Sequence, residues 1–168
     1  VTSLGRVGTP VLFFGFTVGV EFKGFDFSAL VQGVTNRDVY VGGSSIWAFQ
    51  NGGFGQAYEN NLERWTPATA VTASYPRLNI GVNSNNQVQS SYWLRNGDYV
   101  RLKQVELGYS IPQRLLNYIK LQNIRVFARG YNLLTLASKE LDDRDPEIIS
   151  GFSYPMQRLF NFGITIKL

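Results

Sequence analysis

Apolar and polar side chains alternate along two neighbouring stretches near the beginning of the chain. Residues 12–22 and 25–34 each follow a period of two, which is typical of β-strands because successive side chains point to opposite faces. One face collects large apolar side chains, namely Phe14, Phe16, Val18, Val20, Phe22, Phe25 and Phe27. The other face is mostly small or polar, and Lys23-Gly24 between the stretches predicts a tight turn. We therefore predict a β-hairpin with one apolar face.

The same alternation returns in the last part of the chain. Residues 156–168 predict a strand whose apolar row consists of Phe160, Phe162, Ile164, Ile166 and Leu168. Terminal residues of water-soluble domains usually fray into solvent, so an apolar row with a strand pattern is unusual here. The pattern indicates a strand that faces something other than water.

Two further long strands are predicted in the second half of the chain. Residues 98–111 alternate clearly, whereas residues 121–135 read as a strand whose facing the pattern does not fix. Between them, Pro112 and residues 113–119 predict one or two helical turns. The five predicted strands are joined by a tight turn, a very long loop, a short helical connector and a loop of intermediate length. Such alternation of short turns and long loops is typical of outer-membrane β-barrels.

The long loop, residues 35–97, has no sustained period. Glycine, asparagine and proline interrupt it, and it predicts only short strands near 38–41 and 76–82 and a helical turn at 58–65. It is too aromatic for a disordered linker, which indicates a functional loop. Four of its aromatic residues are candidates for stacking on a ligand or for contacting a partner, or else pack the loop against itself: Trp47, Phe49, Tyr58 and Trp65.

Two all-β architectures fit the alternation. Half-buried strands of a soluble sandwich and lipid-facing strands of a barrel both alternate, so alternation alone does not separate them. Here the polar face carries few charges and the apolar face is crowded with phenylalanine, which favours antiparallel strands of a large transmembrane β-barrel. Five strands form only part of such a barrel. The alternative is a soluble β-sandwich that binds carbohydrate or mediates adhesion.

The composition argues against an enzyme. The chain has no histidine and no cysteine, which removes the commonest general base and the usual zinc ligands. Asp142, Asp143, Asp145 and Glu147 crowd into one loop, which predicts a solvated acidic segment more than a cation site or a separated pair of catalytic carboxylates. The net charge of +4 comes from scattered residues, so we expect no nucleic-acid partner.

Five ordered motifs resemble the SusC/RagA family of TonB-linked outer-membrane transporters. SYWLRNGDYVRLKQVELGYSIP (91–112) is similar to a typical barrel strand of that family, and IRVFARGYNLLTL (124–136) to the next one. Asp145-Pro146-Glu147 matches a D-P-E loop signature, and YPMQRLFNFGI (154–164) matches the closing strand. FGFTVGVEFKGFDFSALVQGV (14–34) resembles a hairpin of the family. The chain departs from the family in ending on Leu168 instead of an aromatic residue.

The resemblance implies a TonB-dependent receptor in the outer membrane of a Gram-negative bacterium. Residues 1–168 would be the C-terminal part of its barrel, with the plug and the other strands absent. The family imports oligosaccharides or other large nutrients with a SusD-like lipoprotein, draws energy from the TonB complex and uses no cofactor. By the same resemblance, the short turns lie on the periplasmic side and the loops outside. The row from Phe160 to Leu168 would face lipid and serve as the signal read by the barrel-assembly machinery.

Overall fold

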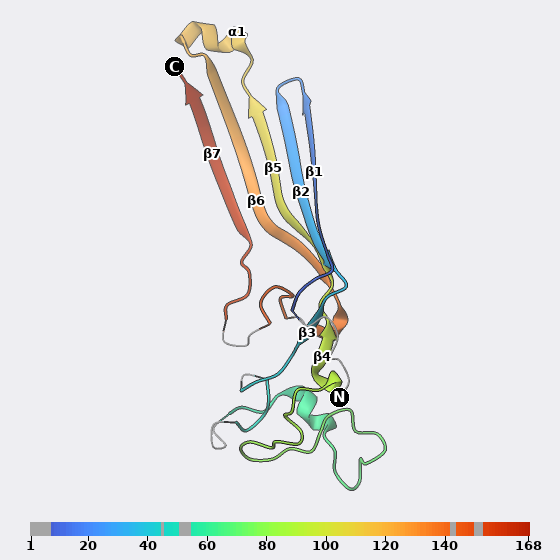
Figure 1. The fold of residues 1–168 in the computed structure, drawn as a ribbon. Helices are drawn as coiled ribbons and strands as arrows, with labels where there is room; N and C mark the ends of the chain where they lie inside the picture. Colours follow the sequence, from blue (N-terminus) through green and yellow to red (C-terminus); the bar gives the residue numbers. More distant parts are fainter. Residues whose placement is uncertain (1–7, 45, 51–54, 142–143, 150–152) are drawn as a thin grey trace.

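The computed structural model describes residues 8–44, 46–50, 55–141, 144–149 and 153–168. Its main feature is one long antiparallel sheet of five strands in the order β1-β2-β5-β6-β7 (Figure 1). The strands are β1 (Leu12–Phe22), β2 (Phe25–Thr35), β5 (Tyr99–Ser110), β6 (Asn123–Ala137) and β7 (Leu159–Lys167). Every neighbouring pair along this order is antiparallel, as the sequence predicts.

The hairpin of β1 and β2 follows directly from its turn residues. Lys23 and Gly24 have φ angles of 49° and 86°. Positive φ at both central residues is the signature of a type I′ turn, whose twist matches that of the flanking strands. The turn pairs Phe22 with Phe25 and sets the register of the whole hairpin, so the predicted hairpin is confirmed.

Short and long connections lie at opposite ends of the sheet (Figure 1). The hairpin turn shares one end with the connector from β5 to β6, made of α1 (Gln113–Leu116) and η3 (Asn117–Ile119). The connections from β2 to β5 and from β6 to β7 lie at the other end, called the loop end below. The predicted sorting of connections is confirmed. In the described part of the chain, no helix is long and apolar enough to cross a membrane.

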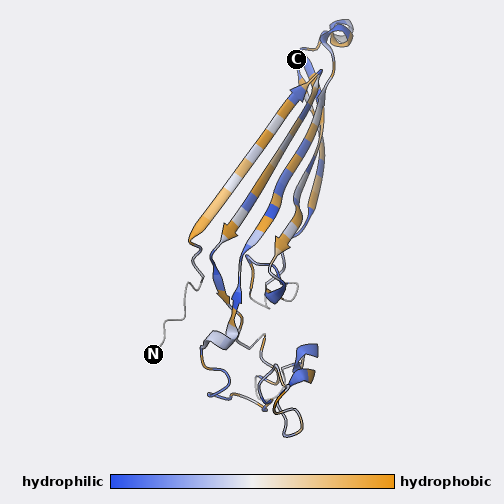
Figure 2. Cartoon of the chain, turned by 90° about the vertical axis from the view of Figure 1, so that its right-hand side faces the viewer, coloured by the Kyte–Doolittle hydropathy of each residue, from blue (hydrophilic) through white to orange (hydrophobic). Residues whose placement is uncertain are grey.

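The two faces of the sheet differ in polarity, and Figure 2 shows the alternation along the strands. Direct cross-strand pairs join Val20 to Phe27, Phe27 to Leu107 and Ala128 to Phe162, so apolar residues line up on one face of the sheet. This apolar face is open, and Phe162 is 80% exposed. A sandwich requires a second sheet packed on that face, and the described residues provide none. The sandwich interpretation is therefore wrong.

Bulges near the loop end explain why the sequence does not fix the facing of β6. The pairing of β5 with β6 runs from Leu102–Leu134 to Gln104–Tyr131, which leaves Lys103 on one strand and two residues on the other without direct partners. One of those two, Asn132, has a φ of 52°. A bulge of this kind shifts the alternation of apolar and polar side chains inside a strand that is itself continuous. The alternation in the sequence therefore does not show which residues of β6 share a face.

A small two-stranded sheet organises the loop end. It joins β3 (Asp38–Tyr40) to β4 (Leu94–Asn96), and among the described residues the 3-10 turns η1 (Glu59–Glu63), η2 (Ser91–Trp93) and η4 (Lys139–Leu141) complete the local structure. The strand predicted near 38–41 and the helical turn predicted at 58–65 are confirmed as β3 and η1 (Glu59–Glu63). The prediction of a strand at 76–82 is wrong. Pro76 begins that stretch without a backbone donor, and the nearby pairing is a single bridge between Arg64 and Tyr75.

Candidate functional site

A network of charged side chains spans three strands on the polar face. Arg125 on β6 donates Nε to Asp26 Oδ2 on β2 at 2.9 Å and lies 2.6 Å from Glu106 Oε1 on β5. Arg129, also on β6, is paired with Glu106. Gly108 leaves the room for this network, because a Cβ there would collide with both Asp26 and Arg125. The network lines a cavity of about 680 Å³ near the short turns.

We expect the two arginines of this network to differ in importance. Arg125 bridges two carboxylates on two other strands, whereas Arg129 bonds to Glu106 and to the hydroxyl of Tyr131. Hydrogen bonds to charged groups contribute about 1.5–3 kcal/mol each, so Arg125→Met should lower the free energy of unfolding more than Arg129→Met does. Urea unfolding of the intact barrel in lipid vesicles measures the free energy of unfolding of each variant. Equal losses for the two variants would contradict the bridging role.

A buried arginine joins the sheet to the loop between β6 and β7. The Arg101 side chain, on β5, is 1% exposed. Its guanidinium donates to Asp145 at 2.8 and 2.9 Å, to Glu147 at 2.7 Å and to the hydroxyl of Thr135 at 2.9 Å. Glu147 also accepts a hydrogen bond from the Tyr99 hydroxyl. Nη2 contacts both oxygens of Asp145 and Nη1 pairs with Glu147, and these charge-assisted hydrogen bonds fix the loop against the strand.

This arrangement corrects the expectation of a solvated acidic loop. The side chains of Asp145 and Glu147 are only 11% and 21% exposed, because Arg101 neutralises them. Asp142 and Asp143 lie outside the described residues. Among the residues that are described, no three histidine, cysteine or acidic side chains come together in a way that could hold a metal ion. The acidic loop therefore has a structural role at the two positions that can be assessed.

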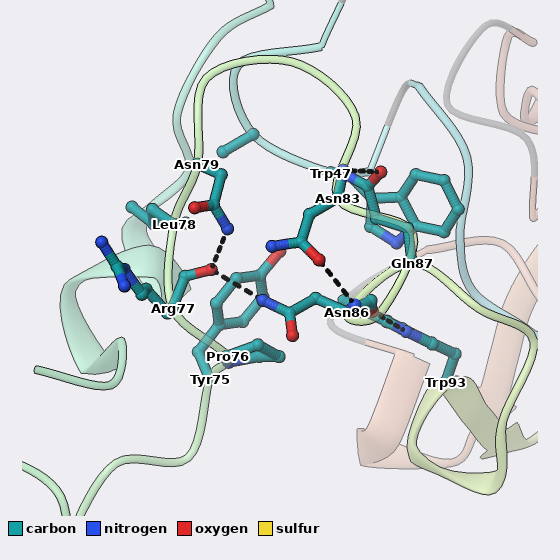
Figure 3. Close-up of a pocket in the computed structure, with 11 residues that line it drawn as sticks. Trp47, Tyr75, Pro76, Arg77, Leu78, Asn79, Asn83, Asn86, Gln87 and Trp93 are labelled. Atoms are coloured by element: carbon teal, nitrogen blue, oxygen red, sulfur yellow. Dashed lines mark hydrogen bonds between the residues drawn. The ribbon is translucent and has the colours of Figure 1, made fainter.

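An aromatic cluster forms the centre of the long loop. Trp93 is buried, and its ring meets those of Trp47, Tyr75 and Tyr92 at centroid distances of 5.9, 6.0 and 4.8 Å. Trp93 Nε1 donates to the backbone oxygen of Asn86 at 2.9 Å, which ties two parts of the loop together (Figure 3). Burial raises the pKa of the Tyr75 phenol, so Tyr75 is neutral at physiological pH.

The four aromatic candidates from the sequence separate into two groups. Trp47 belongs to the cluster around Trp93, while Phe49 and Tyr58 are half-buried. Contact of these three residues with a ligand or partner stays a prediction. Trp65 is 40% exposed and remains available to a ligand. Trp93, Tyr92 and Tyr75 are not among the residues predicted from the sequence. No periodic pattern surrounds them, and only the aromatic pair next to the short β4 strand could have pointed to them.

The residues predicted to face lipid share the apolar face of the sheet. The predicted rows of β1 and β2 lie on this face, and direct pairs through β5 and β6 connect them to the row of β7. Their side chains are exposed, and Leu168 follows the end of β7. Contact with lipid stays a prediction, and the arrangement supplies one continuous apolar surface for it.

Comparison with known proteins gives relatives for most of the chain, although no family model matches it. TonB-dependent receptor P26 of Formosa agariphila is 28% identical over 169 residues, covering 94% of this chain and 17% of the relative. TonB-dependent receptor SusC of Bacteroides thetaiotaomicron is 27% identical over 158 residues, covering 91% of this chain and 15% of the relative. The chain thus spans between 15% and 17% of the length of the curated relatives it matches.

Solved structures of the RagAB peptide importer share the fold. The open-open state superimposes on 95% of this chain with a TM-score of 0.70, and the closed-closed state with a TM-score of 0.71. In both, the sequence identity is 24% and the match covers 17% of the other chain. The open sheet with two unlike faces is accordingly a piece of a β-barrel wall.

Sequence relatives and fold therefore agree on one family. The relatives are named as TonB-dependent receptors, among them SusC, and the fold matches that of the RagAB importer. The predicted resemblance, fold class and location are confirmed. Over most of its length the chain is similar to TonB-dependent receptors, SusC among them, and it has the fold of a β-barrel segment of the RagAB importer.

Proposed function

We propose that the protein to which this segment belongs imports large nutrients, chiefly oligosaccharides, across the outer membrane. It binds the nutrient and passes it through a gated barrel with energy from the TonB complex, and it catalyses no bond chemistry. The observation that supports this most is the sheet with an open apolar face on one side and an ion-paired polar face on the other. Outer-membrane barrels have this polarity, with lipid outside and a polar lumen inside.

In this proposal the segment supplies part of the barrel wall and two extracellular loops. The apolar face contacts membrane lipid, and the apolar row of β7 is read by the barrel-assembly machinery. The network around Arg125 faces the lumen, where the plug from another part of the protein would lie. A SusD-like lipoprotein covers the loop end. The relative named SusC and the likeness to RagAB support this assembly.

The test is import by cells that carry the intact protein. We expect deletion of its gene to abolish growth on one class of oligosaccharide supplied as sole carbon source, and deletion of tonB to do the same. The intact protein purified in detergent should bring a lipoprotein encoded beside it through affinity chromatography. If the deletion strain instead loses growth on oligopeptides, the imported nutrient is a peptide and not an oligosaccharide. The likeness to the RagAB peptide importer is in line with that outcome. Unchanged growth on every oligosaccharide and peptide would contradict the proposal.

A further inference from the structure

Two adjoining cavities open on the surface of the long loop. One measures about 440 Å³ and the other about 370 Å³. They share Trp65 and Arg77, and we call them together the Trp65 groove. Tyr92 and Asn86 line the larger cavity, and Arg64 lines the smaller one. Among the described residues that line either cavity, none is acidic.

Backbone hydrogen bonds hold the aromatic walls of the groove in place. The backbone N–H of Trp65 donates to Tyr75 O at 2.8 Å, and that of Tyr75 donates to Glu63 O at 3.2 Å. Tyr92 stands edge-on to Trp93 and donates its hydroxyl to Ser74 O at 2.7 Å. Trp65 and Tyr92 are nevertheless 40% and 39% exposed. The Tyr92 ring is thus held by Trp93 and Ser74 and has the Arg95 guanidinium over it at 5.8 Å. The Trp65 backbone is fixed, and its ring is partly open to solvent.

Two arginines line the groove, and the Glu63 carboxylate lies at its margin, where it accepts a hydrogen bond from the Ser74 hydroxyl. Arg64 and Arg77 form no ion pair with any acidic side chain in the described part of the chain. The backbone oxygen of Arg77 accepts hydrogen bonds from Asn86 Nδ2 at 3.0 Å and Asn79 Nδ2 at 3.4 Å, which fixes its main chain. Figure 3 shows the Arg77 side chain pointing away from the cluster around Trp93. Its guanidinium remains available to an anion.

We propose that the Trp65 groove binds an anionic sugar unit of an oligosaccharide, one that carries a carboxylate or sulfate group. A pyranose ring stacks its C–H groups on Trp65, and the anionic group pairs with Arg64 and Arg77. Arginine suits this role because its planar fork matches carboxylate and sulfate oxygens. The inference rests on the proposed function and narrows its substrate class to acidic oligosaccharides captured at the extracellular loops.

The backbone of the groove favours a sugar over an extended peptide. A peptide that adds to a protein as a strand needs a backbone edge with free N–H and C=O groups. The segments that approach each other at Trp65 and Tyr75 already use those groups on one another. The groups that remain exposed are the ring of Trp65 and the guanidinium of Arg77, which can stack on a sugar ring and pair with an anionic group.

The test measures binding to the intact protein in detergent by isothermal titration calorimetry. The probes are a tetrasaccharide of mannuronate, a sulfated galactose tetrasaccharide, maltotetraose and tetraglutamate. We expect one of the two acidic sugars to bind at least about tenfold more tightly than maltotetraose. Arg77→Gln and Trp65→Ala should each weaken that binding about tenfold. Raising NaCl from about 0.05 to about 0.5 M should weaken it as well, because exposed charges are screened.

Controls separate the groove from the total charge and from misfolding. Arg114→Gln removes the same charge from α1 at the opposite end of the sheet and should leave binding unchanged. Arg77 is exposed, so Arg77→Gln should keep the barrel folded. The proposal is overturned if neither acidic sugar binds better than maltotetraose, or if both groove variants bind like the unaltered protein. Tetraglutamate that binds as tightly through Trp65 and Arg77 would replace the sugar assignment.

Import assays distinguish this inference from the proposed function. If oligosaccharide import depends on the protein and on TonB while Arg77→Gln and Trp65→Ala leave binding unaltered, only the inference about the groove fails. If the intact protein supports no import but binds an acidic sugar through Arg77, the groove stands as a binding site and the proposed function fails.

Discussion

Replacing Arg101 by methionine is expected to detach the loop between β6 and β7 from the sheet. The substitution leaves the carboxylates of Asp145 and Glu147 without the guanidinium that each now contacts at less than 3 Å. Removing one partner of a buried ion pair costs about 3–5 kcal/mol, because the remaining charge stays desolvated and unpaired. We therefore expect Arg101→Met to lower the free energy of unfolding of the loop end by about this amount. Hydrogen exchange on residues 136–149 of the intact barrel measures the loss directly.

Two comparisons show whether the loss comes from the buried pair. Lys103 lies 3.8 Å from Glu147 and its side chain is 29% exposed, so Lys103→Met should cost less than about 1 kcal/mol. The triple variant Arg101→Met, Asp145→Asn, Glu147→Gln removes the charges together and should recover most of the stability lost by Arg101→Met alone. If the single variant exchanges as slowly as the unaltered protein, Arg101 does not hold this loop.

Local patterns predicted the sheet because each strand carries its own signal. β1 begins and ends where the alternation does, and the two residues of its turn determine the hairpin. The edges of β2 and β5 also follow the pattern to within one residue. Strand alternation is a property of neighbouring residues, so it can be read without knowing what each strand pairs with.

Contacts between distant residues could not be predicted in this way. Arg101 is 44 residues from Asp145 and 46 from Glu147 in the sequence, so a cluster of acidic residues looks solvated until its partner is known. The aromatic cluster around Trp93 likewise gathers residues from across an aperiodic loop. The bulge near Lys103 changes the period inside a strand. These are the features that hold and shape the loop end, and they arise from tertiary structure.

The apolar face provides the sharpest test of the membrane assignment, at the middle of β1. Val18 and Thr17 are neighbours at the same depth, and their side chains lie on the apolar and the polar face respectively. A lysine on the lipid-facing surface of a barrel near the bilayer midplane costs about 2–4 kcal/mol. We expect Val18→Lys to lower the free energy of unfolding of the intact barrel in lipid vesicles by about that amount.

Thr17→Lys is the matched control, and it should cost less than about 0.5 kcal/mol. Its nearest neighbours on the polar face carry no charge: Gly15, Gly19, Ser28, Leu30 and Gln32. An added ammonium at Thr17 therefore meets no like charge and reaches the aqueous lumen, whereas the same group at Val18 must be held in hydrocarbon. Because the two variants have equal charge and adjacent positions, their difference reports which face contacts lipid. Equal losses of unfolding free energy in the two variants would show that both faces of β1 meet the same surroundings. The apolar face would then be covered by something other than membrane lipid.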